Sequence, residues 1–341
     1  MTISDAGFMQ LEQISGKENI TRKKEDLLCY AYDATGDFYL PEAIIFPGSE
    51  NEISQILELA DQHRIPVTPR GAGSGMTGGA VAVNGGLVMV FNRMNQILEI
   101  NEKNLYVRVQ PGVVVGQIHQ QVEAKGLFYP PDPASSAVCT IGGNIAECAG
   151  GPRAVKYGVT RDYVLGLRAV LASGQVIDTG VKTAKGVAGY DLTRLIVGSE
   201  GTLAVATEIT LKLLPKPETV STMAVFFDTM NQAAEAVSGI MNAGVVPRCV
   251  EYLDEACLDL VKDDLDFKLP PSSRALLIIE LDGEAPIVER ETEKILALCQ
   301  TYRALEIMTA KNQGETVRLW KARKALSPVL FKIANNKINE D

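Results

Sequence analysis

Histidine is scarce in this chain of 341 residues, which contains only His63 and His119, each in a polar helical setting. Two histidines so far apart exclude a histidine-rich metal centre, and neither is placed as an obligatory catalytic base. The six cysteines include no C-x-x-C pair and no spacing that would hold zinc or an iron–sulfur cluster. We therefore interpret them as reduced, mostly buried thiols.

Long apolar runs and clustered basic residues are also absent from the sequence. No segment approaches the ~18–20 consecutive apolar residues of a membrane helix, and residues 1–5 begin no signal peptide. A formal charge of −9 argues against a nucleic-acid surface. We expect a cytoplasmic protein with no transmembrane segment, peripheral to the inner membrane only through partners.

Composition and length point to an ordinary globular enzyme of two domains. The chain is 46% hydrophobic and 22% charged, which is typical of soluble α/β proteins. A length of 341 residues exceeds what one compact core usually spans.

The most informative segment is residues 69–79, PRGAGSGMTGG, with five glycines within Gly71–Gly79. It follows the apolar residues 65–68, which we predict to be a strand. Glycine lacks a Cβ atom, so several backbone N–H groups can converge on an anion without obstruction. The segment therefore predicts a phosphate-binding loop.

Residues 73–78 also spell G-x-G-x-x-G, with the acidic Glu99 some way downstream, as in dinucleotide-binding βαβ units. That motif requires a long helix directly after the loop. Here only residues 80–83 separate the loop from a turn and a strand-like run at 87–91. A Rossmann helix does not fit this spacing.

Two further glycine clusters follow, TIGGNIAECAGG at 140–151 and GSEGT at 198–202. Small residues in such a run suit either a backbone lying against a flat aromatic ligand or tight helix packing. Before them we predict a strand at 43–46, a helix with a Ser49/Glu52 capping box, and a helix at 115–125 ending at Gly126. Residues 164–172 and 176–179 predict a hairpin.

Prolines at 215 and 217 predict a domain boundary. We divide the chain into a helical leader (1–36) with little chemistry, a first domain (37–217) and a second domain (218–341). In the second, strands at 223–227, 250–253 and 275–281 alternate with helices at 230–244 and 286–302. This rhythm predicts an α+β domain with helices on one face, followed by a helix at 318–333.

The three glycine clusters, in this order and with these neighbours, resemble the FAD-binding oxidoreductases of the vanillyl-alcohol-oxidase or p-cresol-methylhydroxylase type. The segments 146–153 and 187–192 are most similar to the D-2-hydroxyacid dehydrogenase branch, which includes the glycolate oxidase D subunit. Cys148 departs from the asparagine usual there. The resemblance implies an α+β fold, with a two-subdomain FAD-binding domain of the p-cresol-methylhydroxylase type and an incomplete α+β substrate cap domain.

The resemblance also implies which residues contact the cofactor. Some family members carry FAD on a histidine in the arginine–glycine loop, and this loop has none, so noncovalent FAD is implied. The implied cofactor-binding residues are Pro69, Arg70, Gly71, Ala72, Gly73, Ser74, Thr77, Gly78, Pro131, Asp132, Ser135, Thr140, Gly142, Gly143, Asn144, Glu147, Gly150, Gly151, Glu200, Gly201 and Val205.

In the second domain, LWKAR at 319–323 is similar to the family's tryptophan–arginine motif, whose arginine pairs with the substrate carboxylate. Arg323 and Lys337 are the implied substrate-binding residues. Taken alone, an arginine beside a tryptophan on a helix indicates only a solvated or stacked side chain. The family's histidine-rich segment, which binds a divalent metal and supplies the base, is expected after Asp341, so we expect a truncated chain that holds FAD but is inactive alone.

We therefore expect FAD-dependent oxidation of a small 2-hydroxy acid of the glycolate or D-lactate type to the 2-oxo acid. The α-hydrogen would leave as hydride to flavin N5, and electrons would pass to an iron–sulfur subunit, a companion flavoprotein subunit or a carrier. The alternatives are a D-lactate dehydrogenase or another FAD-linked alcohol oxidase, and a noncatalytic FAD-binding subunit. The sequence leaves open which acid is used, the acceptor and the oligomeric state.

Overall fold

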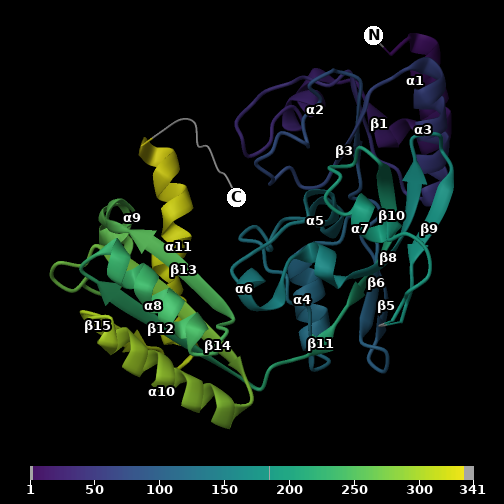
Figure 1. Ribbon diagram of the computed structural model, residues 1–341. Coiled ribbons are helices and arrows are strands. Elements are labelled where there is room, and N and C mark those ends of the chain that lie inside the picture. Colours follow the sequence, from purple (N-terminus) through teal and green to yellow (C-terminus); the bar gives the residue numbers. More distant parts are fainter. Residues whose placement is uncertain (1–2, 184, 334–341) are drawn as a thin grey trace. The chain divides into compact units, whose positions relative to one another are not determined.

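The computed structural model describes residues 3–183 and 185–333, which form two compact units (Figure 1). The first unit contains the described residues up to Gly151 together with Val159–Lys216. The second contains Pro152–Gly158 and the described residues from Pro217 onward. The short segment Pro152–Gly158 therefore belongs by its contacts to the second unit, although it lies inside the sequence of the first.

The first unit contains a four-stranded sheet in the order β1-β2-β4-β3. Strands β2 (Ala43–Ile45), β4 (Leu87–Val90) and β3 (Val67–Arg70) are parallel, and β1 (Ile20–Thr21) is antiparallel to β2. Helices α1 (Asp5–Ser15) and α3 (Glu50–His63) contribute to its core, and α2 (Lys24–Cys29) lies beside β2.

The start of α3 confirms the predicted cap. The amide N–H of Glu52 donates to the Ser49 hydroxyl oxygen at 3.2 Å, and the Glu52 carboxylate accepts from the amide of Gly48 at 2.8 Å. The cap fixes where the chain turns from β2 into α3. It thereby sets the register that leads into β3 and the glycine loop.

The remainder of the first unit is built on an antiparallel five-stranded sheet in the order β5-β6-β10-β8-β9. Its strands are β5 (Ile97–Asn101), β6 (Tyr106–Val109), β10 (Ala204–Lys212), β8 (Val164–Leu171) and β9 (Val176–Gly180). The β8–β9 pairing confirms the predicted hairpin. The other elements are α4 (Val115–Glu123), α5 (Ile141–Glu147), α7 (Leu192–Ile196) and the pair β7 (Leu127–Phe128) and β11 (Leu214–Pro215).

The second unit is an antiparallel four-stranded sheet in the order β13-β14-β12-β15. Its strands are β13 (Cys249–Asp254), β14 (Ala275–Gly283), β12 (Thr219–Phe227) and β15 (Glu306–Thr309). Its helices are α6 (Ala154–Tyr157), α8 (Met230–Asn242), α9 (Glu255–Val261), α10 (Ala285–Thr301) and α11 (Gln313–Ile333). Three short 3₁₀ turns, Lys17–Asn19, Thr160–Tyr163 and Lys262–Asp264, complete the two units.

The prediction that helices cover one face of this sheet is wrong. Met223, Val225 and Phe227 of β12 pack with α8 and α10, whereas Ala224 and Phe226 pack with α9 and α11. Figure 1 shows α8 and α10 together on one side of the sheet. The reason is that β12 and β14 are apolar on both faces, so both faces need a cover.

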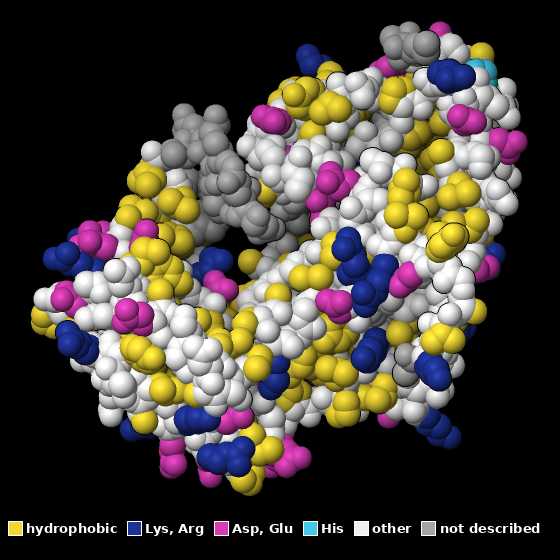
Figure 2. Space-filling model, viewed as in Figure 1, with side chains coloured by type: hydrophobic (Ala, Val, Ile, Leu, Met, Phe, Trp, Pro, Cys, Tyr) yellow, Lys and Arg dark blue, Asp and Glu magenta, His cyan; other side chains and the backbone are white. Residues whose placement is uncertain are grey.

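The surface mixes side chains of every kind. Figure 2 shows exposed hydrophobic side chains interspersed with acidic and basic ones on the visible faces. None of the helices in the described part of the chain is both long enough and apolar enough to cross a membrane.

Candidate functional site

The glycine loop lies at the carboxyl end of β3, which pairs in parallel with β4. Loops at this end of parallel strands commonly bind ligands in α/β folds. Beyond the loop the chain passes through a turn at Gly85 and Gly86, both with positive φ, directly into β4. The structure therefore agrees with the exclusion of a Rossmann helix, and Glu99 lies instead on β5, where it accepts from the Tyr106 hydroxyl at 2.8 Å.

The first and second glycine clusters lie against each other. A Cβ atom on Gly71 would lie 2.5 Å from the Thr140 hydroxyl oxygen and 3.4 Å from the Cα of Gly143. Thr140 precedes α5, and Gly143 is inside it. Two segments about seventy positions apart in sequence thus form one surface, as the predicted cofactor site requires.

The third cluster joins the end of the same helix. The amides of Gly198 and Glu200 donate to the carbonyls of Ile145 and Ala146, at 2.8 and 2.9 Å. A Cβ atom on Gly201 would lie 3.1 Å from the Pro69 side chain, at the start of the first loop. All three clusters predicted to contact the cofactor therefore meet within the first unit.

The predicted segment around Pro131 also reaches this region. A Cβ atom on Gly151 would lie 2.5 Å from the Asp132 carbonyl oxygen. His119 of α4 contacts the Pro131 carbonyl through Nε2 at 2.9 Å. The carbonyl of Ser135 accepts from the amide of Cys139 at 2.9 Å, directly before Thr140. The segment 131–135 is thus fixed between α4 and the second glycine cluster.

The glycines fall into two classes by what a side chain would meet. For Gly71, Gly73, Gly142, Gly151 and Gly201, a Cβ atom would lie within 3.1 Å of the chain's own atoms. For Gly75 and Gly78 no atom lies within 4 Å, and for Gly143 and Gly150 the nearest atom is 3.6 Å away. The chain's own packing explains the first class. In the second class, Gly75 and Gly78 face open space, and a methyl group on Gly143 or Gly150 would make only ordinary contacts.

Two buried hydroxyl groups beside these glycines fit a polar ligand. The side-chain oxygens of Thr140 and Ser199 are shielded from solvent and have no hydrogen-bond partner among the described residues. Buried hydroxyls are normally hydrogen-bonded, because an unpaired one costs free energy. Open glycine backbone with unpaired hydroxyl groups beside it fits a cofactor that combines a flat ring system with phosphates and hydroxyls.

Carboxylates lie on one side of the loop. Glu147, the last residue of α5, accepts from the Thr77 hydroxyl at 3.0 Å, and a Cβ atom on Gly79 would lie 3.3 Å from Glu200. Burial raises the pKa of Glu147, the Thr77 hydrogen bond opposes this, and the charges of Glu200 and Asp33 add to it. Carboxylates repel phosphate but accept hydrogen bonds from hydroxyl groups. These two therefore suit a hydroxyl-bearing part of a ligand and not its phosphates.

A pocket of about 260 Å³ adjoins the first and third clusters. Pro69, Gly201 and Val205, all predicted cofactor residues, line it together with apolar side chains of α3 and β8. Leu57, Ala60, Val67 and Val170 give it an apolar side, while Asp61, Arg64 and Thr202 make the rest of its lining polar.

Arg323, the predicted substrate residue within the described part of the chain, lies in the second unit. Arg323 of α11 donates through Nε to the Glu251 carboxylate on β13. Trp320, one turn earlier, donates to the Glu280 carboxylate at 2.7 Å. The hydrogen bond to Glu251 uses Nε of Arg323. The two terminal nitrogens of the guanidinium are further donors on the same planar group. Lys337 lies outside the described residues.

Sequence reasoning missed Glu251 as the partner of Arg323, because the two residues are 72 positions apart and no local pattern links them. It also missed the leader residues Tyr32 and Ala34, which contact the glycine loop region.

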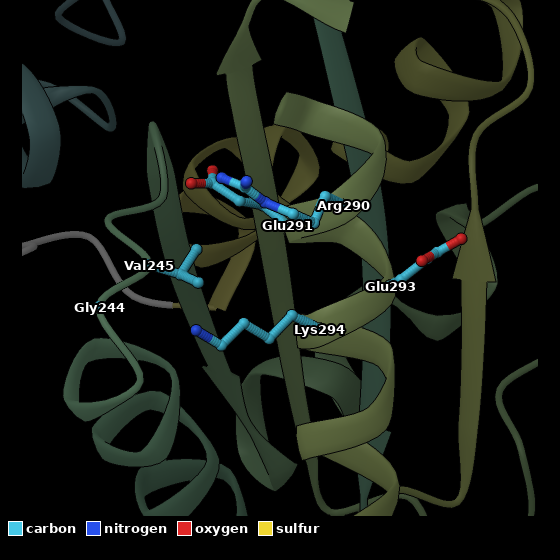
Figure 3. Close-up of a pocket in the computed structure, with 6 residues that line it drawn as sticks. All are labelled: Gly244, Val245, Arg290, Glu291, Glu293 and Lys294. Atoms are coloured by element: carbon cyan, nitrogen blue, oxygen red, sulfur yellow. The ribbon is translucent and has the colours of Figure 1, made fainter. Parts of the chain in front are cut away.

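A separate hollow of about 480 Å³ lies on the second unit, lined by Gly244 and Val245 and by residues of α10 (Figure 3). None of the predicted site residues lines it. In the described part of the chain, no group of three histidine, cysteine, aspartate or glutamate side chains is arranged to hold a metal ion.

Comparison with known proteins gives matches over nearly the whole chain. Residues 41–180 match the family described as "FAD binding domain", and residues 216–340 match "FAD linked oxidases, C-terminal domain". The glycolate oxidase subunit GlcD of Bacillus subtilis is 48% identical over 333 residues, which cover 97% of this chain and 71% of that protein. A D-lactate dehydrogenase of Anaerostipes hadrus is 33% identical over 297 residues, covering 84% of this chain and 62% of that protein.

Among solved structures, p-cresol methylhydroxylase with substrate bound superposes with a TM-score of 0.72 at 18% identity, covering 94% of this chain and 70% of that one. At this identity the likeness concerns the fold alone. Together these matches confirm the resemblance, the α+β fold of the p-cresol-methylhydroxylase type, and FAD as the cofactor of the matched domain.

Proposed function

The chain belongs to the family of FAD-linked oxidases, and we propose that it binds FAD noncovalently and oxidises a 2-hydroxy acid of the glycolate or D-lactate type to the 2-oxo acid. The observation that carries the proposal is the meeting of three glycine clusters around backbone that the chain's own packing leaves open at Gly75 and Gly78.

The predicted residues take different parts in holding FAD. The backbone of residues 71–78 would face the pyrophosphate, since its amides are the donors that an anion requires. The helix α5, with Gly143 and the Thr140 hydroxyl, would lie against the flavin side of the cofactor. Glu147 and Glu200 suit hydroxyl groups of the ribityl or ribose part. The pocket at Pro69, Gly201 and Val205 suits the adenine.

The bound FAD would supply a hydride acceptor for the substrate α-hydrogen. Arg323 would hold the substrate carboxylate through the terminal nitrogens that its contact with Glu251 leaves available. Lys337 remains a proposed substrate residue. We assign no catalytic base and no metal site among the described residues.

We further propose the division into a leader (1–36), an FAD-binding domain (37–217) and a substrate cap (218–341). The matched relatives named as a glycolate oxidase subunit suggest companion subunits, and we propose that electrons leave the flavin through an iron–sulfur or a companion flavoprotein subunit. We also propose a cytoplasmic location, with any approach to the inner membrane made through those partners.

Substrate binding can be tested with a reporter that the chain already contains. Trp320 is the only tryptophan and lies three positions from Arg323. Titration with D-lactate or glycolate should change its fluorescence in the wild-type protein and in Lys324→Ala, an exposed control on the same helix. The change should be lost in Arg323→Ala. An unchanged titration of Arg323→Ala would contradict the assigned role of this arginine.

Reduction of the flavin distinguishes an enzyme from a noncatalytic subunit. Under anaerobic conditions, the visible absorbance of the flavin should bleach when the right 2-hydroxy acid is added to the complete protein with its partners. Flavin that is bound but reduced by none of glycolate, D-lactate and D-2-hydroxyglutarate would favour the noncatalytic alternative.

A further inference from the structure

Arg70 ends β3 and leads into the glycine loop, yet its side chain is buried, with 5% of the residue exposed. Its two terminal nitrogens donate to backbone carbonyls, Nη1 to Ala80 at 2.9 Å and Nη2 to Tyr32 at 2.7 Å. The guanidinium carbon lies 5.6 Å from the centre of the Tyr30 ring. The side chain of Arg70 thus joins Tyr32, in the leader, to Ala80, the residue directly after the glycine loop.

Nearby groups offset part of the cost of burying this guanidinium. Burial lowers the pKa of Arg70, while the Asp33 carboxylate and the phenol groups of Tyr30 and Tyr32 oppose that shift. Arginine remains the cationic side chain of proteins, because its ordinary pKa is far above neutral pH. Its cation is therefore held against protein groups on more than one side.

Gly73 crosses directly over this side chain. A Cβ atom on Gly73 would lie 2.1 Å from Nη2 of Arg70 and 2.6 Å from its central carbon, and Gly73 has a φ of +68°. Both the contact and the backbone angle demand glycine. The amide of Ala34 also donates to the carbonyl of Gly75 at 3.2 Å, which ties the leader to the far side of the loop.

We propose that Arg70 is a positioning residue, which links Tyr32 to Ala80 beneath Gly73 and fixes the loop backbone for the cofactor, so that residues 30–34 are an integral part of the FAD site. The inference rests on the proposed function in one respect, that this loop receives FAD. Its geometric part concerns the chain alone. An arginine that bound the phosphate directly would point its terminal nitrogens toward the side of the loop that faces the cofactor. The terminal nitrogens of Arg70 donate instead to the carbonyls of Tyr32 and Ala80.

The first test is a double-mutant cycle measured by thermal unfolding of the FAD-free protein. Gly73→Ala should lower the unfolding midpoint by about 5 °C or more, because the new methyl group meets the guanidinium. In an Arg70→Ala background the same change should cost less than about half as much, since only the backbone strain remains. Equal costs in both backgrounds would overturn the proposed contact between loop and side chain.

The second test separates a positioning residue from a phosphate ligand. Lysine keeps the positive charge but cannot bridge two carbonyls with a planar fork. Arg70→Lys should therefore lower the unfolding midpoint of the FAD-free protein and weaken FAD binding at least about tenfold. Arg290→Lys, an exposed change on α10, is the matched control.

Each outcome of this comparison decides the proposal. An Arg70→Lys protein with normal FAD-free stability and weaker FAD binding would show a direct phosphate contact and overturn it. Normal FAD binding by Arg70→Lys would overturn it as well, whether or not the FAD-free protein is destabilised. If the wild-type protein bound no FAD, the proposed function would fail, while the coupling of Gly73 and Arg70 would still decide the geometric part.

Discussion

Gly142 lies directly against Pro111: its amide donates to the Pro111 carbonyl at 2.8 Å, and a Cβ atom on Gly142 would lie 2.8 Å from the Pro111 Cβ. The neighbouring Gly143 has no such contact, because the nearest atom to its Cβ position is 3.6 Å away. Two adjacent glycines in one helix are therefore present for different reasons. The first serves the fold, and the second is available to a ligand.

Gly143→Ala should leave the FAD-free protein as stable as before or more stable by about 0.5–1 kcal/mol, because alanine favours a helix over glycine. It should nevertheless weaken FAD binding at least about tenfold, because the methyl group would occupy the ligand side of α5. Gly142→Ala is the matched control and should lose about 1–3 kcal/mol of stability through the clash with Pro111. Full FAD affinity in Gly143→Ala would show that the cofactor does not approach this helix.

The flavin should leave the protein when the chain unfolds. Residues 69–79 contain no histidine to form a covalent bond with FAD. We expect a yellow protein whose colour passes into the supernatant on acid precipitation. Flavin retained in the washed pellet would contradict noncovalent binding.

Glu147→Gln should stabilise the FAD-free protein at neutral pH, raising the unfolding midpoint by about 1–2 °C. Burial raises the pKa of Glu147 in the folded protein, so the folded chain binds this proton more readily than the unfolded chain. Stability of the wild-type protein should therefore rise as pH falls through the raised pKa toward the ordinary glutamate range. The variant should lose this gain when unfolding is followed between about pH 7 and pH 5. If the unfolding midpoint of Glu147→Gln depended on pH as that of the wild type does, another group would be responsible for the dependence.

Cys148→Asn should raise stability by about 0.5–1 kcal/mol. Cys148 ends α5 with φ 52° and ψ 47°, a left-handed conformation that asparagine adopts more readily than most residues. The left-handed backbone at this position thus explains why asparagine would suit it. Cys29→Asn, at the exposed end of α2, should change stability little, and urea unfolding of both variants measures the difference.

Asp282→Ala should destabilise the second unit by about 3–5 kcal/mol, because it leaves buried partners without their carboxylate. The side chain of Asp282 is fully buried and accepts from Lys156 Nζ at 2.6 Å and from the Tyr157 hydroxyl at 2.9 Å. Arg248 lies 3.5 Å from the same carboxylate. Asp282→Asn should lose less, since its amide oxygen still accepts one bond. Equal stability of Asp282→Ala and the wild type in thermal unfolding would contradict a structural role.

Local signals predicted a large part of the fold. The Ser49 cap, the β8–β9 hairpin and the apolar periodicity of α3 are set by neighbouring residues, so a sequence pattern contains them. The glycine clusters could likewise be recognised from the sequence, because glycine density is a local property, and their contact with FAD stays a prediction. Helix α9 and strand β15 were missed. β15 (Glu306–Thr309) is a partly exposed edge strand, defined only by its pairing with β12.

The remaining features depend on pairings between distant residues. The bond of Arg70 to Tyr32 spans 38 positions, and that of Arg323 to Glu251 spans 72. In both cases the sequence identified the arginine and missed its partner. A guanidinium points toward the acceptor that the fold places next to it. Because that acceptor is distant in sequence, no local spacing predicts it.

The placement of α6 constrains how such a protein can be recombined. The chain changes units at 151/152, 158/159 and 216/217, and Lys156 and Tyr157 from the inserted segment close over Asp282 of β14. A chimera that exchanges the second unit at residue 217 alone would set a foreign α6 against β14. Exchange of the whole second unit therefore requires all three crossover sites. A single crossover at residue 217 works only if both parents already share the lysine and the tyrosine in α6.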